Sequence, residues 1–298
     1  MKLPDFAYHR PDTVAGALDL LDELGDDAKV LAGGQSLLPV LALRMNAVPN
    51  LVDIARIPEL REIEVGPGGI TIGAGVRHTQ AEFSPVVAEH APLIAGALPY
   101  VGHRAIRNRG TVCGSLAHAD PSAELPAVAL ALDARMIVAG SDGDRMVAAE
   151  DFFQGVFTAD LAETELLRGV HIPAWSDRSG WSVRELSRRH GDFAIVGLAC
   201  AVELDEDGAF AKAALSYFGV AGRPTRVDEA EAALIGQRPG DELYAEVAGI
   251  VSGVLQPAAD LHGSSSYRKH IAGVLAKRCL TEAAGRASAR AEQNGAVA

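Results

Sequence analysis

Val30–Met45 reads VLAGGQSLLPVLALRM, and this stretch decides how the first half of the chain is interpreted. A short apolar run leads into Gly33-Gly34, and two polar residues then precede a second apolar stretch. The pattern predicts a strand, a glycine turn and a helix. Glycine lets a ligand approach the backbone, and amides near a helix start attract anions. We therefore expect Gly33–Leu37 to bind a phosphate or pyrophosphate, although such a turn alone is more often only a turn.

Two flanking elements place this turn within a small β-α-β-type unit. Residues 14–24 carry apolar side chains at helical spacing behind Asp12 and Thr13, either of which can cap a helix. Asn50–Ile54 predicts another strand. In α/β folds ligands bind beyond the carboxyl ends of strands, which is where the turn lies. The stretch is not a P-loop, because no Gly-Lys-Ser/Thr follows, and its adjacent glycines do not form the dinucleotide motif GxGxxG.

A second stretch rich in small residues follows later in the chain. Thr111, Gly114 and Ser115 lie in the run GTVCGS, and Asp120 precedes an apolar helix predicted over 124–132. Small residues again let the backbone approach a ligand, and Asp120 can accept hydrogen bonds from a polyol. A glycine-rich loop before an N-capped helix would explain the same residues without a ligand. Because the chain already has one such loop, we favour a long two-ended ligand such as a dinucleotide.

Several residues near this stretch have competing interpretations. His118 has no second ligand at metal spacing, so we interpret it as a hydrogen-bonding residue rather than a base. Cys113 has no matched base and is interpreted as a packed residue near the ligand rather than a nucleophile. Three arginines precede it, and the sequence leaves open whether they bind phosphates or form a solvated or interface face: Arg104, Arg107 and Arg109.

Composition excludes several classes of function. The chain has 298 residues, 48% of them hydrophobic and 22% charged, as expected for a globular protein with a sizeable core. Its net charge of -12 argues against binding nucleic acid or an anionic membrane. The sequence shows no membrane-spanning run and no secretory signal at its start, so we expect a cytoplasmic protein. Cys113, Cys200 and Cys279 include no CxxC pair, so this chain alone cannot build an iron–sulfur cluster or a structural zinc site.

The remaining sequence predicts two hairpins, a long helix and a second domain. Alternating runs joined by glycine-rich turns predict hairpins over 60–74 and 135–147, and apolar spacing predicts one helix over 79–98. We place a domain boundary in the polar segment 173–180. Beyond it, strands followed by helices suggest an α+β domain, with strands expected at 181–187, 195–204 and 209–217 and helices at 228–235, 241–254 and 266–280.

Three motifs together resemble one known family. AGGQSLLPVLALRM at 32–45, RNRGTVCGSLAHADPSAELPAVALALDA at 107–134 and RRHGDFAIVG at 188–197 are similar to the FAD-binding medium subunit of molybdenum hydroxylases. That family includes the flavoprotein subunit of carbon monoxide dehydrogenase and the flavin domain of xanthine dehydrogenase. The resemblance covers nearly the whole chain in the same order. It is far more specific than either glycine motif alone.

The resemblance implies a fold and a set of cofactor contacts. The expected fold is mixed α+β. Residues 1–176 form a PCMH-type (vanillyl-alcohol-oxidase) FAD domain of two α/β subdomains. Residues 177–285 form a C-terminal domain of the carbon monoxide dehydrogenase flavoprotein type, with a three-stranded antiparallel sheet and helices, and residues 286–298 form a frayed tail. The implied FAD-binding residues are Ala32, Gly33, Gly34, Gln35, Ser36 and Leu37 in the first loop, Thr111, Gly114, Ser115 and Asp120 in the second, and Phe193 near the isoalloxazine. Arg184 and Arg188 lie shortly before Phe193 in the sequence and are not assigned to the cofactor.

The resemblance also implies an electron relay between subunits. In it, a molybdenum cofactor in a large subunit hydroxylates the substrate, and two 2Fe–2S clusters in a small subunit pass electrons to non-covalent FAD on this chain. The reduced flavin then serves an external acceptor, which the sequence does not name. The expected assembly is a dimer of heterotrimers. The flavin carries the redox chemistry, so no catalytic acid or base is assigned to this chain.

One departure from the family pattern bears on the substrate. Many relatives have TxGGxL where this chain has Cys113 in place of the first glycine. Cysteine would strain a position that needs positive φ, so we expect a backbone there that tolerates a small side chain. The cysteine version resembles members that act on aromatic N-heterocycles. Two alternatives remain open, a freestanding flavin oxidase of the same fold and an assembly subunit without a cofactor.

Overall fold

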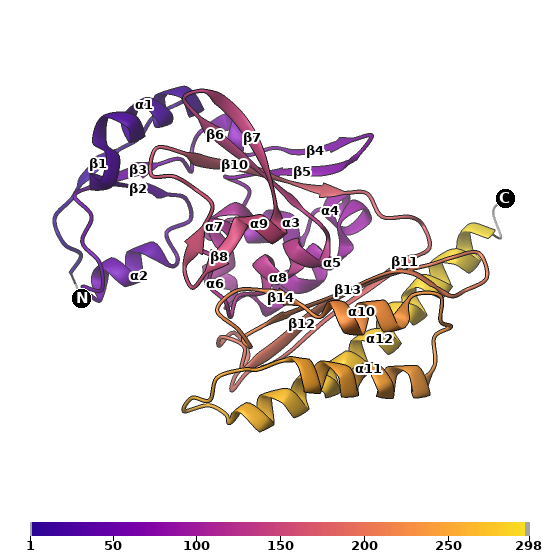
Figure 1. The fold of residues 1–298 in the computed structure, drawn as a ribbon. Helices are drawn as coiled ribbons and strands as arrows, with labels where there is room; N and C mark the ends of the chain where they lie inside the picture. The colour runs from indigo at the N-terminus through magenta and orange to yellow at the C-terminus, as the bar shows by residue number, and fades with distance from the viewer. Residues whose placement is uncertain (1, 296–298) are drawn as a thin grey trace.

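The computed structural model describes residues 2–295, which fold into two α/β units and a C-terminal α+β domain (Figure 1). The first unit is a parallel sheet of strand order β1-β3-β2. Thr13 caps its first helix by accepting a hydrogen bond from the Gly16 amide at 3.1 Å. Because the strands are parallel, their carboxyl ends share one edge. The elements are β1 (Ala7–His9), α1 (Val14–Leu24), β2 (Ala28–Leu31), α2 (Leu37–Ala42) and β3 (Asn50–Asp53).

The second unit is a five-stranded antiparallel sheet of order β4-β5-β10-β6-β7 with short helices packed against it. Both predicted hairpins are present in it. Its strands are β4 (Ile63–Gly66), β5 (Gly69–Gly73), β6 (Arg135–Gly140), β7 (Gly143–Ala148) and β10 (Leu166–Pro173). A separate two-stranded sheet consists of β8 (Phe153–Gly155) and β9 (Thr158–Ala159), and the single-turn helices η1, η2 and η3 cover Gly25–Asp27, Pro58–Leu60 and Leu98–Tyr100.

The single helix predicted over 79–98 is wrong. The segment contains three short helices, because Pro85 and Pro92 each begin a new one. Proline has no amide hydrogen and clashes with the preceding turn, so it is tolerated only at a helix start. The helices of this unit are α3 (His78–Glu82), α4 (Pro85–His90), α5 (Pro92–Ala97), α6 (Arg104–Arg107), α7 (Val112–His118), α8 (Glu124–Ala131) and α9 (Ala149–Phe152).

The second glycine motif also differs from expectation. The sequence suggests a loop at 110–115, yet Thr111 is the N-cap of α7 and its hydroxyl accepts a hydrogen bond from the Gly114 amide at 3.0 Å. Cys113 therefore lies in the first turn of a helix and not at one of the positive-φ positions. The substitution of cysteine for glycine needs no unusual backbone, as expected.

The C-terminal domain is a four-stranded antiparallel sheet covered on one face by helices (Figure 1). A two-residue strand extends the three strands that the resemblance implies. Side chains of β12 alternate between faces: Leu198, Cys200 and Val202 contact the helices, whereas Ala199 and Ala201 face the first domain. The elements are β11 (Ser179–Leu186), β12 (Val196–Leu204), β13 (Phe210–Phe218), β14 (Thr225–Arg226), α10 (Asp228–Leu234), α11 (Asp241–Val254) and α12 (Ser265–Gly295).

Residues 286–295, which belong to the predicted frayed tail, are helical in the structure. Helix α12 continues to Gly295, and Ala287 is fully buried. A β-carbon on Gly180 would lie 1.9 Å from the Ala283 carbonyl oxygen, so the strand backbone packs directly on the helix. Burial against the sheet, which local composition does not reveal, orders this helix. Residues 296–298 lie outside the described chain.

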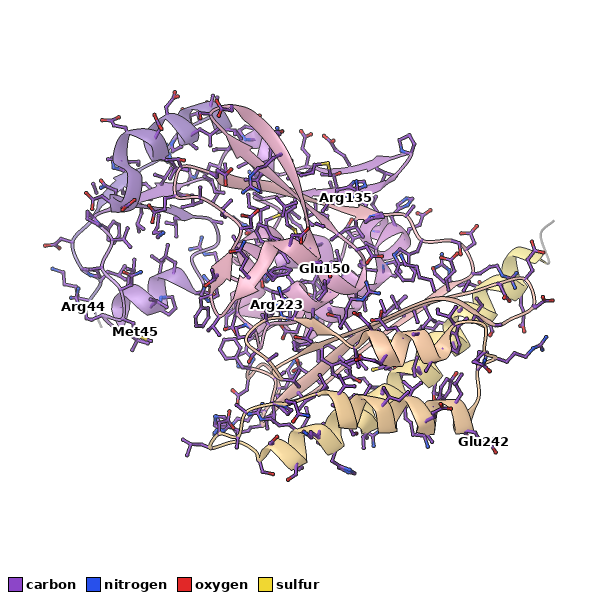
Figure 2. The ribbon with its side chains drawn as sticks, in the orientation of Figure 1. Arg44, Met45, Arg135, Glu150, Arg223 and Glu242 are labelled. Carbon is purple, nitrogen blue, oxygen red and sulfur yellow. The ribbon has the colours of Figure 1, made fainter. Side chains whose placement is uncertain are left out.

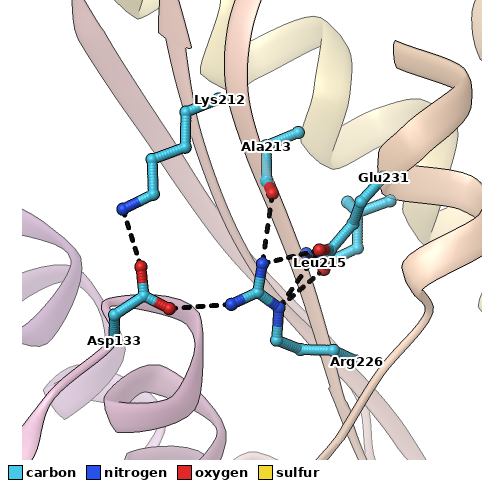
Figure 3. Close-up of polar contacts among 6 residues, drawn as sticks. All are labelled: Asp133, Lys212, Ala213, Leu215, Arg226 and Glu231. Atoms are coloured by element: carbon cyan, nitrogen blue, oxygen red, sulfur yellow. Dashed lines mark hydrogen bonds and ion pairs between the residues drawn. The ribbon is translucent and has the colours of Figure 1, made fainter. Parts of the chain in front are cut away.

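Charged contacts join the two domains (Figure 3). Asp133, at the end of α8 with φ of 51°, accepts hydrogen bonds from Lys212 at 2.6 Å and from Arg226 at 2.8 Å. Arg226 also pairs with Glu231 at 2.6 Å, and Glu231 accepts the Leu215 amide at 2.7 Å. These contacts hold α8 against the sheet of the second domain.

Figure 2 distinguishes the domain junction from the periphery. Arg223 lies at the junction and donates a hydrogen bond to the Phe153 carbonyl at 3.2 Å. Arg44 and Met45 lie at the outer edge of the first unit, beyond α2, where Met45 is exposed. Among residues 2–295, none of the helices combines the length and apolar character needed to cross a bilayer.

Candidate functional site

Both glycine motifs open onto one cavity of about 710 Å³ between the two α/β units. Residues of β2, α7 and the segment 157–167 form its walls, and the loop 191–193 of the second domain reaches it. All eleven residues that the resemblance implies line this cavity: Ala32, Gly33, Gly34, Gln35, Ser36, Leu37, Thr111, Gly114, Ser115, Asp120 and Phe193. The fold thus brings together residues that lie up to 161 positions apart, from 32 to 193.

The first loop presents unpaired backbone amides. The amides of Gly33 through Ser36 donate no hydrogen bond to any residue in 2–295. Gly34 has φ of 69°, a conformation that glycine adopts without strain. The Gln35 side-chain amide donates to the Gly33 carbonyl at 3.0 Å and so stiffens the turn. Backbone amides seldom remain without partners, so this loop fits an anionic ligand.

The second motif lies directly against the first. A β-carbon on Gly33 would lie 2.3 Å from the Arg109 carbonyl oxygen and 2.5 Å from the Gly110 α-carbon. A β-carbon on Gly114 would lie 2.7 Å from the Thr111 hydroxyl oxygen and 3.6 Å from the Ala32 β-carbon. Only glycine fits either place without movement of the backbone or of the cap. The two motifs therefore form one continuous cradle.

The Thr111 hydroxyl and the Asp120 carboxylate each have a partner within the chain. Thr111 caps α7, and the Asp120 Oδ1 atom accepts a hydrogen bond from the Ser122 amide at 2.8 Å. Asp120 is nevertheless part of the cavity wall and is largely buried. Its second oxygen makes no hydrogen bond to any residue in 2–295, so it can accept one from a ligand hydroxyl.

Sequence reasoning missed His78, which is 4% exposed and lines the cavity. Neither ring nitrogen makes a hydrogen bond within residues 2–295. Burial lowers its pKa to about 4, and the nearby Arg107 charge acts in the same direction, although the Thr111 backbone partly opposes the shift. The imidazole is neutral at neutral pH and can donate from one nitrogen and accept at the other. The orphaned ring is a second feature that fits a polar ligand.

Glu124 is a second missed residue, which the sequence suggests only as part of a helix start. It is buried, lines the cavity and begins α8. Burial raises its pKa to about 7, and Asp120 adds to the shift. Glu185 of β11 has its pKa raised to about 8, first by burial and then by Glu124. No sequence pattern signals these carboxyl groups, because their environment depends on how the domains pack.

The structure gives different environments to the three arginines whose role the sequence leaves open. Arg107 is buried and pairs with Glu82 at 2.8 Å, so it is a structural residue. Arg104 lies over the Phe83 ring at 6.0 Å. Arg109 is exposed at a different cavity from the one described above. Of these three, none lines the glycine cavity with its side chain.

Cys113 is a packed residue near the cavity, as predicted, whereas the His118 side chain makes no hydrogen bond within residues 2–295 and its hydrogen-bonding role stays a prediction. The Cys113 thiol is fully buried beside the Ile72 carbonyl at 3.6 Å, and burial raises its pKa far above the usual range. A protonated, inaccessible thiol is not a nucleophile. His118 lines the cavity, and its ring centroid lies 5.0 Å from that of Phe157. Burial lowers the pKa of His118, with Asp120 opposing the shift.

The second domain contributes the cavity rim. Phe193 is 68% exposed at the rim, beside Gly191 and Asp192. Gly191 has φ of 83°, and a β-carbon there would lie 2.8 Å from the His103 ring, so the loop packs closely on the first domain. Arg188 pairs with Asp192 at 3.7 Å. Arg184 pairs with Glu282, away from the cavity wall.

Residues 2–295 contain no group of three or more His, Cys, Asp or Glu side chains placed to hold a metal ion. The cavity walls offer amides, hydroxyls and two imidazoles beside apolar residues, together with the carboxyl groups of Asp120, Glu124, Glu163, Glu165 and Asp192. This set suits an extended ligand that carries a pyrophosphate and a polyol.

Comparison with known proteins identifies the family. A model described as the FAD binding domain in molybdopterin dehydrogenase matches residues 4–175, and one described as the CO dehydrogenase flavoprotein C-terminal domain matches residues 181–283. The 6-hydroxypseudooxynicotine dehydrogenase complex subunit alpha of Paenarthrobacter nicotinovorans is 40% identical over 287 residues, which is 96% of this chain and 97% of that one.

Solved structures agree with the sequence relatives. A chain of carbon monoxide dehydrogenase from Hydrogenophaga pseudoflava superposes with a TM-score of 0.93 at 37% identity, over 96% of this chain and 99% of that chain. A chain of quinoline 2-oxidoreductase from Pseudomonas putida 86 superposes with a TM-score of 0.91 at 36% identity, with the same coverage. The chain therefore belongs to the family of FAD-binding medium subunits of molybdenum hydroxylases and is an oxidoreductase subunit.

Proposed function

We propose that this chain carries non-covalent FAD in a heterotrimeric molybdenum hydroxylase and relays electrons from a partner's 2Fe–2S clusters to an external acceptor. The observation that carries this proposal is the convergence of both glycine motifs on one cavity, whose first loop has four amides without a partner among residues 2–295. FAD, when bound, supplies reversible one- and two-electron chemistry. Residues of this chain bind, orient and shield it.

Each wall of the cavity has a role in this proposal. The amides of Gly33–Ser36 neutralise the pyrophosphate, and Gly33 and Gly114 keep side chains out of the cradle. Asp120 accepts hydrogen bonds from the ribityl hydroxyls. His78 packs against Gly110, where an added β-carbon would lie 3.0 Å from the imidazole ring. Its neutral imidazole would form a hydrogen bond with the cofactor near the same loop. Phe193 covers the ring end from the second domain.

The partner subunits follow from the chemistry that this chain lacks. We assign the molybdenum cofactor to a large subunit and the clusters to a small one, in a dimer of heterotrimers in the cytoplasm. Residues 2–295 hold no candidate metal cluster, and the three cysteines are unpaired and buried. An aromatic N-heterocycle is the proposed substrate class, which the names of the quinoline and 6-hydroxypseudooxynicotine enzymes support.

The first experiment is a visible absorption spectrum of the purified chain, followed by acid release and identification of the chromophore. Two flavin bands and released FAD are the expected result. Candidate N-heterocycles should leave the isolated flavin oxidised, whereas the complex reassembled with both partners should bleach. Direct bleaching of the isolated chain would favour a freestanding oxidase. A colourless chain that takes up no added FAD would overturn the cofactor assignment and favour an assembly role.

A further inference from the structure

A second cavity lies at the same edge of the parallel sheet as the first glycine loop. Its lining includes Tyr8 of β1 and Asp53, the last residue of β3, whereas β2 of the same sheet leads into Gly33. Ligands of α/β folds bind at the carboxyl edge of such sheets. The rest of the lining is Ala55 and four arginines from three segments: Arg56 and Arg61 between β3 and β4, Arg77 before α3, and Arg109 before α7. We call this feature the arginine cavity.

The charge of the arginine cavity is unbalanced. Asp53 is its one acidic lining residue, and both of its oxygens are occupied: the Tyr8 hydroxyl donates to one and the Ala55 amide to the other at 2.8 Å. The guanidinium groups of the four lining arginines make no hydrogen bond or ion pair with any residue in 2–295. This concentration of positive charge lies on a chain whose net charge is -12.

Some partly exposed arginines elsewhere in the chain have acidic partners, whereas others, such as Arg135 and Arg238, have no hydrogen bond or ion pair within residues 2–295. Arg145 pairs with Asp160 at 2.7 Å and with Glu165 at 2.8 Å, although its side chain is 40% exposed. Arg168, also partly exposed, pairs with Asp144 at 2.6 Å. Four like charges placed around one hollow repel each other unless an anion lies between them. All four arginines are exposed, so water and salt screen their charges; what marks the arginine cavity is that the four share one hollow, where a bound anion would lower their mutual repulsion.

The side chains define the chemistry of that anion. Guanidinium groups form paired, parallel hydrogen bonds with phosphate or carboxylate oxygens. Four arginines that converge from three segments suit a compact ligand with several anionic oxygens better than a single carboxylate. The Tyr8 hydroxyl, already donating to Asp53, can accept one further hydrogen bond.

The arginine cavity adjoins the FAD cradle but does not share its walls. The Arg109 carbonyl packs on Gly33. The backbones of Arg77 and Thr111, the N-cap of α7, form an isolated antiparallel β-bridge. The side-chain residues of the arginine cavity are absent from the lining of the larger cavity. We propose that the arginine cavity is a second anion site, which binds a small molecule bearing two or more linked phosphoryl groups.

The test is calorimetric titration of the FAD-loaded chain, because bound FAD blocks the first loop. Inorganic pyrophosphate should bind once per chain, and its affinity should fall about tenfold or more between 0.05 and 0.2 M salt, since exposed charges are screened. ADP is the second probe and adenosine the third. Tighter binding of ADP than of pyrophosphate identifies a nucleotide ligand, equal binding identifies a phosphate site alone, and adenosine should not bind.

Variants connect the binding to the arginines. The double variant Arg56→Gln/Arg61→Gln should weaken pyrophosphate at least tenfold while the FAD content stays unchanged, which also shows that the variant folds. Arg238→Gln removes an exposed arginine of the second domain and should change nothing. Arg77→Gln gives a second, independent test at another segment of the lining.

Two results would overturn the proposal. One is the absence of saturable binding of pyrophosphate and ADP by the wild-type chain at low salt. The other is binding that the double variant and Arg77→Gln both retain in full. Failure of the chain to bind FAD would be a separate result, because the flavin absorbance reports it independently and the anion titration can then be repeated on the FAD-free chain with the same variants.

Discussion

Gly33 and Arg109 are in direct contact through their backbones: a β-carbon on Gly33 would lie 2.3 Å from the Arg109 carbonyl oxygen. The contact joins the loop after β2 to the segment before α7, which are about 75 residues apart in sequence. No side chain can yield there, because the neighbouring atoms belong to the backbone. The cradle for the pyrophosphate therefore depends on the absence of one methyl group.

Gly33→Ala should reduce FAD affinity at least tenfold, because the two motifs must move apart to admit the new β-carbon. The measurement is the FAD-to-protein ratio together with a fluorescence titration of the FAD-free chain. Gly249→Ala is the matched control, since a β-carbon there meets nothing within 4 Å on an exposed helical position. That control should keep full FAD binding and gain up to about 1 kcal/mol in stability. Full FAD binding by Gly33→Ala would contradict the shared cradle.

His78→Leu should weaken FAD binding about five- to tenfold without destabilising the FAD-free chain. Both ring nitrogens are buried without partners within residues 2–295, so the imidazole contributes no hydrogen bond to the stability of the FAD-free chain. An apolar side chain of similar size can therefore replace it without loss of stability. The lost hydrogen bond to the cofactor is worth about 1 kcal/mol. Thermal unfolding with and without FAD separates the two effects. His90→Leu, at an exposed site, is the control, and equal FAD affinity in both variants would remove His78 from the site.

The pH dependence of stability should show two opposing contributions. His78 has its pKa lowered to about 4, so between pH 6.5 and 4 the unfolded chain binds a proton that the folded chain does not. Its contribution makes the free energy of unfolding fall as the pH falls. Glu124 has its pKa raised to about 7, so between pH 4.5 and 7 the folded chain holds a proton that the unfolded chain has lost. Its contribution makes stability fall as the pH rises.

The opposing contributions of His78 and Glu124 partly cancel in the wild type, so a variant of each residue is needed to measure them separately. In the FAD-free chain, Glu124→Gln should gain stability relative to wild type as the pH rises from 4.5 to 7, by up to about 3 kcal/mol. His78→Leu should instead gain relative to wild type as the pH falls from 6.5 to 4. Denaturant unfolding at each pH measures both. Parallel profiles for wild type and Glu124→Gln would show that this carboxyl group is ordinary in the folded protein.

The three thiols should be unreactive in the native chain. Cys113, Cys200 and Cys279 are buried and unpaired, and burial raises the pKa of each. A colorimetric disulfide reagent should therefore titrate no thiol before unfolding and three in denaturant. Cys113→Gly, which restores the common family residue, should lower stability by about 1 kcal/mol because a helical glycine is flexible and packs less. Its FAD content should stay the same, since Cys113 supplies packing and not chemistry.

Asp133→Asn tests the contacts between the domains. Asparagine tolerates the left-handed conformation at this position but loses the charge that pairs with Lys212 and Arg226. The pairs are partly exposed, so the expected loss of stability is about 1 kcal/mol or less. Asp133→Val should cost more, because a β-branched residue is strained at positive φ. Thermal unfolding of both variants and of the wild type gives the comparison. Midpoints equal to that of the wild type in both variants would show that neither the charge nor the backbone conformation matters.

Local signals were sufficient for much of the fold. Thr13 and Val14 mark the start of α1 by cap and spacing, and the glycine-rich turns mark both hairpins. The cavity residues were also predicted to act together, from motifs whose order is characteristic of a family. Pro85 and Pro92 each begin a short helix, although the apolar spacing around them predicts a single one. Here the local backbone rule, which forbids proline inside a helix, outweighed periodicity.

The sequence by itself determined most of the elements and the composition of the cradle, because caps, glycine turns and apolar periods act between near neighbours in the chain. Only the tertiary structure decided which titratable side chains are buried away from water and which of them have no hydrogen-bond partner. The ring of His78 and the carboxyl of Glu124 are perturbed because distant segments bury them. Helix α12 extends past residue 286 because Gly180 lets a strand pack on it. The arginine cavity exists because four segments that are distant in the sequence lie together at one edge of the sheet. Its local charge therefore depends on the tertiary structure.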